Sequence, residues 1–175
     1  MKLRHYDFDG RARFITFGTH RGLPLLVDDE IRTIICRVIN RIRQENQFQL
    51  LAYVIMPEHI HLVIQPTATT KVGATVGEIK RISGIDIHHI LETQKSPYLS
   101  QLTVIRNRAP RFVFWQRRCY DHNCRTEDSL WEKVNYCHNN PVKRKLVDMP
   151  EKWRWSSYRW YAGLDDIPLR MDYSG

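Results

Sequence analysis

Two histidines separated by a single residue are the first side chains in this sequence that could do chemistry together. His59 and His61 lie in the apolar stretch from Met56 to Ile64, which favours a β-strand. Because side chains alternate between the two faces of a strand, both imidazoles are expected on one face and the apolar residues on the other. Neutral imidazole is a good ligand for divalent metal ions. The pair therefore predicts half of a metal-coordination shell; the alternative is a pair of polar residues on a solvated strand face.

Tyr136 is a second candidate because of its predicted place on a helix. Thr126 can cap this helix, and acidic residues follow in its first turn. The predicted core stripe of the helix comprises Leu130, Trp131, Val134 and Cys137. Tyr136 falls on the polar side, where a core tyrosine would not be placed. Pro141 is expected to end the helix directly after Asn140.

The strand that carries the histidines needs neighbours to hold it. A strand at residues 48–56 precedes it, and Pro57-Glu58 makes a tight connection, so the two are expected to form a hairpin in mid-sheet. A further strand is predicted at residues 11–17, closed by Gly18. The region from 93 to 110 is irregular and predicts loops that border short extended pieces. A short segment at 111–115 and an edge strand at 118–122 are expected to follow it.

Two helices are predicted between these strands. The first is capped by Asp28 or Asp29, and its buried residues recur at spacings of three and four. They are Ile31, Ile34, Ile35, Val38, Ile39 and Ile42. The second covers residues 76–91, although Gly77 and Gly84 weaken its pattern.

The composition is that of a globular protein with one domain. The chain has 175 residues, 42% of them hydrophobic, and a mean hydropathy of -0.48. No apolar run approaches the roughly 18 residues that a membrane span needs, so no membrane partner is expected. The first nine residues turn polar at once and lack the apolar core of a signal peptide, which predicts a cytoplasmic protein.

The chain is strongly basic, with a net charge of +8 and a sequence pI of about 9.5. The positive residues gather in three clusters, with aromatic residues between them. The clusters are Arg106, Arg108, Arg111, Arg117 and Arg118, then Lys143, Arg144 and Lys145, then Lys152, Arg154 and Arg159. Cations neutralise phosphates and aromatic rings stack on unpaired bases, so the combination suits nucleic acid. A basic protein whose aromatic residues form its core remains the alternative.

The four cysteines form neither a disulfide scaffold nor a paired zinc-ribbon pattern. Cys119, His122 and Cys124 could clamp a zinc ion, but their irregular spacing favours free thiols.

Five motifs in the sequence occur in the order and approximate spacing of one known family. They are Pro57-Glu58-His59-Ile60-His61, Phe114-Trp115-Gln116-Arg117, Tyr120-Asp121-His122, Tyr136 through Val142, and Trp155-Ser156-Ser157-Tyr158. Over roughly residues 10–162 the sequence thereby resembles the REP-associated tyrosine transposases, which belong to the single-tyrosine HUH transposases. Five ordered motifs are far more specific than any one of them.

The resemblance implies an α+β fold, a ferredoxin-like sandwich with helices packed on a central antiparallel sheet. It implies a core at about residues 10–162 of a single domain spanning 1–175, with a C-terminal tail at 163–175 for which disorder is the expected state. The implied partner is single-stranded or hairpin DNA, handled by a monomer or homodimer at the nucleoid. The basic residues of the first two clusters would bind that DNA.

The resemblance also implies cleavage and rejoining of single-stranded DNA beside a palindromic hairpin. By analogy, His59, His61 and Asn140 hold a divalent ion, Mg²⁺ or Mn²⁺, and Tyr136 is the nucleophile. Lys133 and Lys143 are close enough in sequence to favour its phenolate. Two alternatives stay open: a catalytically silent protein that binds DNA hairpins, and a zinc-stabilised RNA-binding module that uses Cys119 and Cys124.

Overall fold

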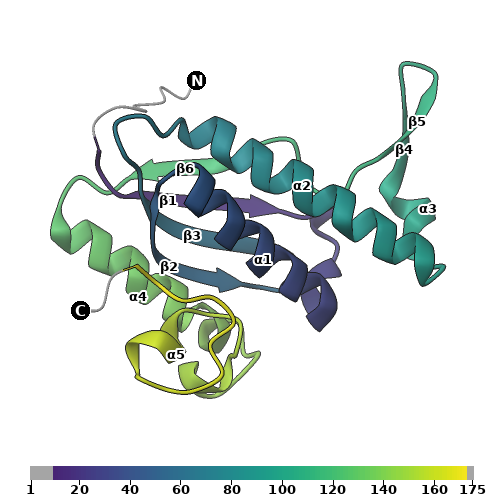
Figure 1. Ribbon diagram of the computed structural model, residues 1–175. Coiled ribbons are helices and arrows are strands. Elements are labelled where there is room, and N and C mark those ends of the chain that lie inside the picture. Colours follow the sequence, from purple (N-terminus) through teal and green to yellow (C-terminus); the bar gives the residue numbers. More distant parts are fainter. Residues whose placement is uncertain (1–9, 173–175) are drawn as a thin grey trace.

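The computed structural model describes residues 10–172 and contains a four-stranded antiparallel sheet (Figure 1). Its strands stand in the order β2-β3-β1-β6. Their bounds are β1 (Arg13–Gly18), β2 (Gln49–Ile55), β3 (His59–Gln65) and β6 (Tyr120–Asn123). Every neighbouring pair is antiparallel.

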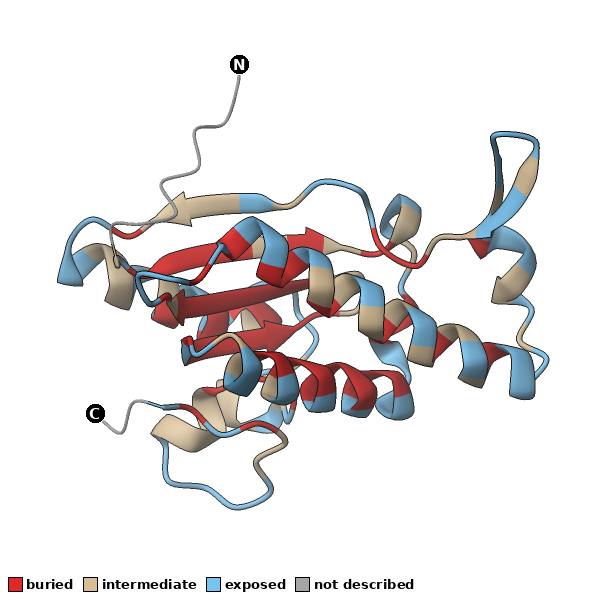
Figure 2. Cartoon of the chain, turned by 45° about the horizontal axis from the view of Figure 1, so that its top comes forward, coloured by how far each residue is buried: buried red, intermediate tan, exposed pale blue. Residues whose placement is uncertain are grey.

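Helices cover both faces of this sheet and complete an α+β sandwich, as predicted. Helices α1 (Asp29–Glu45) and α2 (Val72–Thr93) pack on one face, and α4 (Glu127–Lys143) packs on the other. Neighbouring residues of β1 point to opposite faces, since Phe14 belongs to the cluster under α4 and Ile15 to the cluster under α1 and α2. Figure 2 shows β1, β2 and β3 largely buried between helices whose outer sides are exposed, whereas the edge strand β6 is only partly buried.

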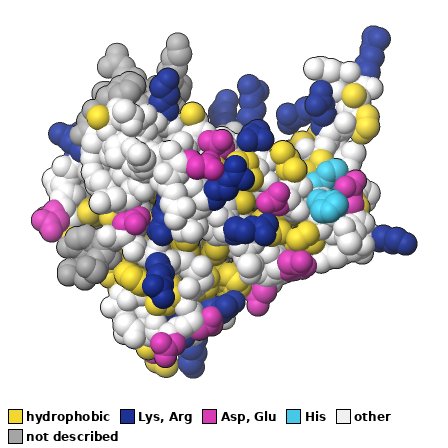
Figure 3. All heavy atoms as spheres, in the orientation of Figure 1, with side chains coloured by type: hydrophobic (Ala, Val, Ile, Leu, Met, Phe, Trp, Pro, Cys, Tyr) yellow, Lys and Arg dark blue, Asp and Glu magenta, His cyan; other side chains and the backbone are white. Residues whose placement is uncertain are grey.

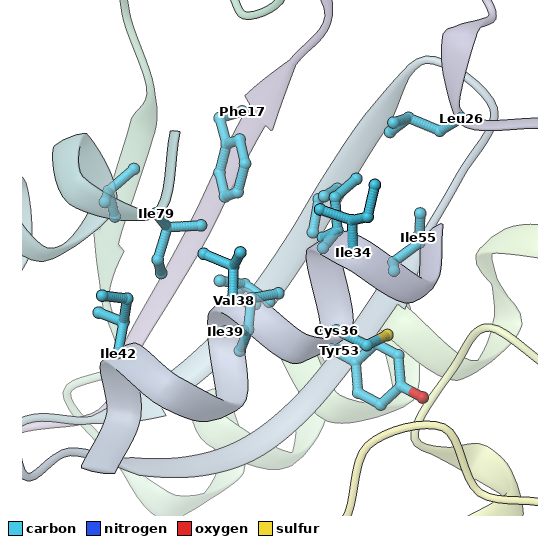
Figure 4. Close-up of a cluster of buried hydrophobic side chains, with 14 of the residues drawn as sticks. Phe17, Leu26, Ile34, Cys36, Val38, Ile39, Ile42, Tyr53, Ile55 and Ile79 are labelled. Atoms are coloured by element: carbon cyan, nitrogen blue, oxygen red, sulfur yellow. The ribbon is translucent and has the colours of Figure 1, made fainter. Parts of the chain in front are cut away.

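The first predicted helix is confirmed as α1. The side chain of Asp28 accepts hydrogen bonds from the backbone N–H groups of Glu30 and Ile31, at 2.8 and 3.4 Å, and so caps the helix. The six predicted core residues are all buried, and Figure 4 shows several of them packed against the sheet. The second predicted helix, α2, is longer than expected and runs through both glycines.

The hairpin of β2 and β3 is confirmed, but its predicted position in mid-sheet is right only for β3. Strand β2 lies at the edge of the four-stranded sheet. Residues 153–161 cover that edge: the Ile55 N–H donates to Trp155 O at 2.8 Å, and the Ser157 N–H donates to Tyr53 O at 2.9 Å. The Trp155-to-Tyr158 motif therefore has a structural task, because it pairs the backbone groups that an edge strand would leave open.

Helix α4 does not end at Pro141 as the sequence suggested. It continues to Lys143, with Pro141 inside it. A proline has no N–H group, so Pro141 cannot donate the helical bond to Cys137 O, but the helix extends only two residues beyond it. The next N–H groups still bond in helical fashion, since Arg144 donates to Asn140 O at 2.9 Å. Asn140 consequently keeps a helical position facing the sheet.

The irregular region after α2 contains more order than the sequence indicated. A short helix, α3 (Tyr98–Leu102), leads into a two-stranded sheet of β4 (Thr103–Arg106) and β5 (Ala109–Phe112). We call residues 103–112 the β4–β5 arm. The predicted edge strand is confirmed as β6, which pairs with β1 at the other edge of the main sheet.

The C-terminal segment, for which disorder was the expected state, is packed as far as residue 172. Leu169 and Met171 are buried in the cluster under α1 and α2. The Asp172 N–H donates to Leu50 O at 3.0 Å, and the Asp172 carboxylate accepts from the Leu50 N–H at 2.8 Å. Ile167, Leu169 and Met171 are spaced two residues apart, but this alternation is short and includes Pro168, so it does not by itself predict a packed segment.

No helix within residues 10–172 is both long and apolar enough to span a membrane. The predicted absence of a signal peptide concerns residues 1–9, which lie outside the described part of the chain.

Ser157 gives a direct test of the segment that covers β2. Its fully buried hydroxyl accepts from the Tyr53 N–H at 3.1 Å and lies 2.9 Å from His138 Nε2 on α4. Ser157→Ala leaves these buried groups unpaired, so we expect the free energy of unfolding to fall by about 1–3 kcal/mol. Thermal unfolding followed by circular dichroism measures this, with the exposed Ser100→Ala as the matched control. Equal melting temperatures for the two variants would contradict the assigned role.

Candidate active site

The two predicted metal ligands converge at the start of β3. The Nε2 atoms of His59 and His61 lie 3.0 Å apart, and the ring centroids are 4.6 Å apart. His61 is only 5% exposed and stacks on Phe14 at a centroid distance of 5.1 Å. Ile60 lies in the cluster on the opposite face of the sheet. The shared face deduced from strand alternation is thus confirmed.

A hydrogen bond to the other nitrogen of each imidazole fixes its orientation. Nδ1 of His61 lies 2.7 Å from Thr16 Oγ1 on the paired strand β1. Nδ1 of His59 lies 3.1 Å from the Glu58 carboxylate, which also accepts from Arg144 Nη2 at 2.8 Å. A carboxylate only accepts, so the proton of neutral His59 belongs on Nδ1. The Nε2 lone pair of His59 is then directed at His61.

Helix α4 brings two further side chains to the histidines. The buried Asn140 amide Nδ2 donates to His61 Nε2 at 3.1 Å. Because that nitrogen accepts, the proton of His61 is on Nδ1 and is donated to Thr16. Tyr136, one turn earlier, sets its ring edge-to-face against His61 and Phe14, with centroids 5.2 and 5.7 Å away. It is 39% exposed, in agreement with its predicted place on the polar side.

Burial keeps these imidazoles neutral at physiological pH. It lowers the pKa of His61 to about 3, and the neighbouring His59 adds to the effect. Burial also lowers the pKa of His59, although Glu58 opposes this. Neutral imidazole is the form that binds a metal ion.

The residues present fit a divalent ion. Imidazole nitrogens lie about 2.0–2.1 Å from a bound zinc ion, and two such ligands at a right angle are about 3.0 Å apart. The Nε2 separation here is 3.0 Å. A half-turn of the Asn140 amide would present its oxygen as a third ligand. Two nitrogens and one oxygen suit Mn²⁺ or another transition ion better than Mg²⁺, which prefers oxygen.

The alternative zinc site is not assembled. Cys124 is buried in the cluster under α4, whereas Cys119 packs against the cluster on the other face of the sheet. Within residues 10–172, no group of three or more His, Cys, Asp or Glu side chains could hold a metal ion.

The two lysines suggested by sequence proximity differ in their positions. Lys143 Nζ lies 5.6 Å from the centroid of the Tyr136 ring. Lys133 instead forms an ion pair with Glu132 at 2.8 Å and lies over Phe14. Lys143 is therefore the cation placed to act on the Tyr136 phenol.

The predicted DNA-binding residues form three groups rather than one patch, and all of them are exposed. Lys143, Arg144 and Lys145 lie at the end of α4, beside the site. Arg117 and Arg118 follow Gln116, whose N–H donates to Gly18 O at 2.9 Å, and Gly18 pairs with His59. Arg106, Arg108 and Arg111 lie on the β4–β5 arm (Figure 3).

Sequence reasoning missed three residues that shape the site. Glu58 adjoins His59 in the first motif and could have been found there. Thr16 and Phe14 meet His61 only through the pairing of β1 with β3, which no local pattern specifies.

Comparisons with known proteins agree with this fold and site. Residues 15–139 match the family described as "Transposase IS200 like", and the chain belongs to that family. It is 25% identical over 153 residues, 83% of each chain, to the "Putative REP-associated tyrosine transposase" of Haemophilus influenzae. The resemblance drawn from the five motifs is thereby confirmed.

Two solved structures share the fold. The structure of a REP-associated tyrosine transposase bound to a REP hairpin has a TM-score of 0.70 and 20% sequence identity, and the match covers 100% of this chain and 92% of that one. A transposase described as putative, from Deinococcus radiodurans R1, has a TM-score of 0.52 and 18% identity, over 79% of this chain and 97% of that one.

Titration with Mn²⁺ tests the ligand assignment without requiring catalysis. His59→Ala should abolish binding of one ion per chain, because half of the imidazole pair is lost; His59 is preferred to the more deeply buried His61. Glu58→Gln should weaken affinity by about 10–100-fold through loss of the orienting carboxylate. Isothermal titration calorimetry measures both, and the exposed His89→Ala serves as control. Unchanged affinity in His59→Ala would exclude this site.

Proposed function

We propose that this protein is a metal-dependent single-stranded DNA endonuclease and transposase that nicks and rejoins DNA beside a palindromic hairpin through a 5′-phosphotyrosine. The observation that carries the proposal is the convergence of His59, His61 and Asn140 beside Tyr136, in a member of the IS200-like transposase family. The histidines belong to strand β3, and Asn140 and Tyr136 belong to helix α4, which packs on the face of the sheet to which the histidines point.

Tyr136 is the proposed nucleophile. A tyrosine hydroxyl is a weak nucleophile until it loses its proton, so the attacking phenolate needs nearby positive charge. Lys143 supplies such charge from above the ring. As the phenol loses its proton, Oη bonds to phosphorus and the bond to the 3′ oxygen breaks. The 3′ oxygen takes up a proton and leaves as a hydroxyl, while the 5′ phosphate stays on Tyr136.

The phosphotyrosine ester conserves the energy of the broken phosphodiester. Attack by another 3′ hydroxyl on the same phosphorus reverses the step and joins a new strand, so the protein needs no nucleotide cofactor. The partial exposure of Tyr136 suits this exchange, because an incoming DNA end can reach the phenol.

His59, His61 and Asn140 are the residues that would hold the divalent ion. When bound, such an ion withdraws charge from the phosphate oxygens and fixes the phosphate for in-line attack. Glu58 and Thr16 keep both Nε2 lone pairs directed to the shared point. Arg144, held on Glu58 at 2.8 Å, joins the end of α4 to the histidine strand.

DNA with a hairpin and a single-stranded flank is the proposed substrate. The chain carries a net charge of +8, and the structural relative described above is bound to a REP hairpin. Such a chromosomal substrate would put the protein at the nucleoid. A silent hairpin-binding protein is the second candidate, and the complete set of catalytic side chains favours the enzyme. The separation of Cys119 from Cys124 disfavours the zinc-stabilised RNA-binding module.

Tyr136→Phe removes only the hydroxyl that the proposal makes the nucleophile. The variant should bind a labelled hairpin oligonucleotide with near wild-type affinity and form no covalent adduct with Mn²⁺ present. Denaturing electrophoresis detects the adduct as a shifted protein–DNA band.

Tyr120→Phe is the matched control, because Tyr120 is also exposed and also packs edge-on to Phe14, at 6.5 Å. This variant and Tyr158→Phe should both form the adduct. An adduct in Tyr136→Phe, or DNA found on another tyrosine by mass spectrometry, refutes the assignment.

A further inference from the structure

The β4–β5 arm projects from the body of the protein beyond the ends of the main strands (Figures 1 and 2). It is a two-stranded ribbon in which Thr103 pairs with Phe112 and Arg106 with Ala109. Asn107 and Arg108 form its tip, and both have left-handed backbones, with φ of 51° and 63°. A two-residue turn of this kind matches the twist of the strands, so the ribbon has a defined shape.

The arm carries positive charge that the protein itself leaves unused. Arg106, Arg108 and Arg111 are exposed, and within residues 10–172 none of them forms an ion pair. The sequence from Thr103 to Phe112 contains no acidic residue. Three exposed guanidinium groups that form no ion pair in the described part of the chain add little to the stability of the fold, and their concentration on ten residues favours binding of a polyanionic partner.

An apolar pair lies on the other face of the same ribbon. Ile105 is 72% exposed, and its cross-strand partner Pro110 is also exposed. Residues paired across two strands share a face, so Ile105 and Pro110 are separated from Arg106 and Arg111, which alternate with them. Figure 3 shows hydrophobic and basic side chains together on the projection. A partner must therefore offer apolar edges as well as negative charge.

The base of the arm is anchored on α2, and the chain after it joins the end of the sheet at which His59 lies. Phe112 stacks on His88 of α2 at a centroid distance of 4.1 Å, and Trp115 Nε1 donates to the buried Ser83 hydroxyl at 3.0 Å. The following residue, Gln116, bonds to Gly18, the register partner of His59. Exposed Arg117 and Arg118 continue the positive charge from the arm to that end of the sheet.

We propose that the β4–β5 arm grips the double-stranded stem of the DNA hairpin in its major groove. Strands in a ribbon are about 4.8 Å apart, and the major groove, about 12 Å wide, admits a two-stranded ribbon. The arginines neutralise phosphates on the groove walls, while Ile105 and Pro110 contact apolar base edges such as thymine methyl groups. The inference rests on the proposed hairpin substrate and adds a duplex-binding surface apart from the catalytic residues.

Arg106→Ala/Arg108→Ala tests the proposal, with Arg37→Ala/Arg41→Ala as a control that removes the same charge. Arg37 and Arg41 are exposed on α1, with side chains 70% and 61% accessible. Fluorescence anisotropy measures the affinity for two DNAs: a hairpin with its single-stranded flank, and the flank alone. Titrations between about 50 and 200 mM salt give the salt dependence.

The arm variant should bind the hairpin at least tenfold more weakly, with a salt slope reduced by about two, and should bind the flank as wild type does. The control should bind both DNAs normally. Wild-type affinity of the arm variant for the hairpin overturns the proposal, and so does an equal loss for the flank. Netropsin, a small molecule that occupies the minor groove of A·T-rich DNA, tests which groove the arm enters. If netropsin bound to an A·T-rich stem abolished the difference in hairpin affinity between the wild type and the arm variant, the major-groove assignment would be wrong.

These measurements report binding alone. A wild-type protein that binds the hairpin through the arm but never forms an adduct would refute the proposed enzyme and leave the arm inference standing.

Discussion

The candidate site depends on the close approach of Asn140 on α4 to His61 on β3, where Asn140 Nδ2 lies 3.1 Å from His61 Nε2. Neither element holds the site alone: β3 carries the imidazoles, and α4 carries the phenol and the amide. Their alignment is maintained by apolar packing, because Val134 and Cys137 are buried against the sheet below Tyr136. The phenol can stand partly in solvent because the neighbouring turns of its helix are held so firmly.

Buried polar groups make this arrangement specific. His138, two residues before Asn140, faces Ser157, and Ser157 in turn pairs with Tyr53 of β2. Burial lowers the pKa of His138 to about 4, so it stays neutral. The contact between His138 and Ser157 holds α4 against the segment that covers β2. On the other side of the sheet, the buried Arg13 guanidinium donates two hydrogen bonds to the Asp121 carboxylate and joins β1 to β6. Each pair tolerates only one register of the elements it links.

The sequence predicted those features that depend on local rules. Strand alternation placed both histidines on one face, and helical periodicity placed Tyr136 on the exposed side of α4. The order of five motifs indicated the family. Local rules failed where tertiary contacts decide: Pro141 is accepted within the helix, and Met171 joins the core from a short segment near the C-terminus that was expected to be disordered.

Other features depended on strand register, which the sequence leaves open. Thr16 meets His61 because β1 pairs with β3, and the hairpin lies at an edge because β1, not β2, pairs with β6. The β4–β5 arm was hard to predict for both reasons, because neither a local pattern nor the strand register could be read from the sequence. Its strands are four residues each, and one contains a proline, so the pattern predicted loops that border short extended pieces and not a paired ribbon.

Anomalous X-ray scattering from crystals grown with Mn²⁺ and hairpin DNA, using the Tyr136→Phe protein to prevent cleavage, tests most directly whether strand and helix build one metal centre. The account predicts one strong manganese peak bonded to Nε2 of both His59 and His61, with a DNA phosphate between it and the ring at position 136. A peak elsewhere, or a manganese ion bonded to only one of the two histidines, would contradict it.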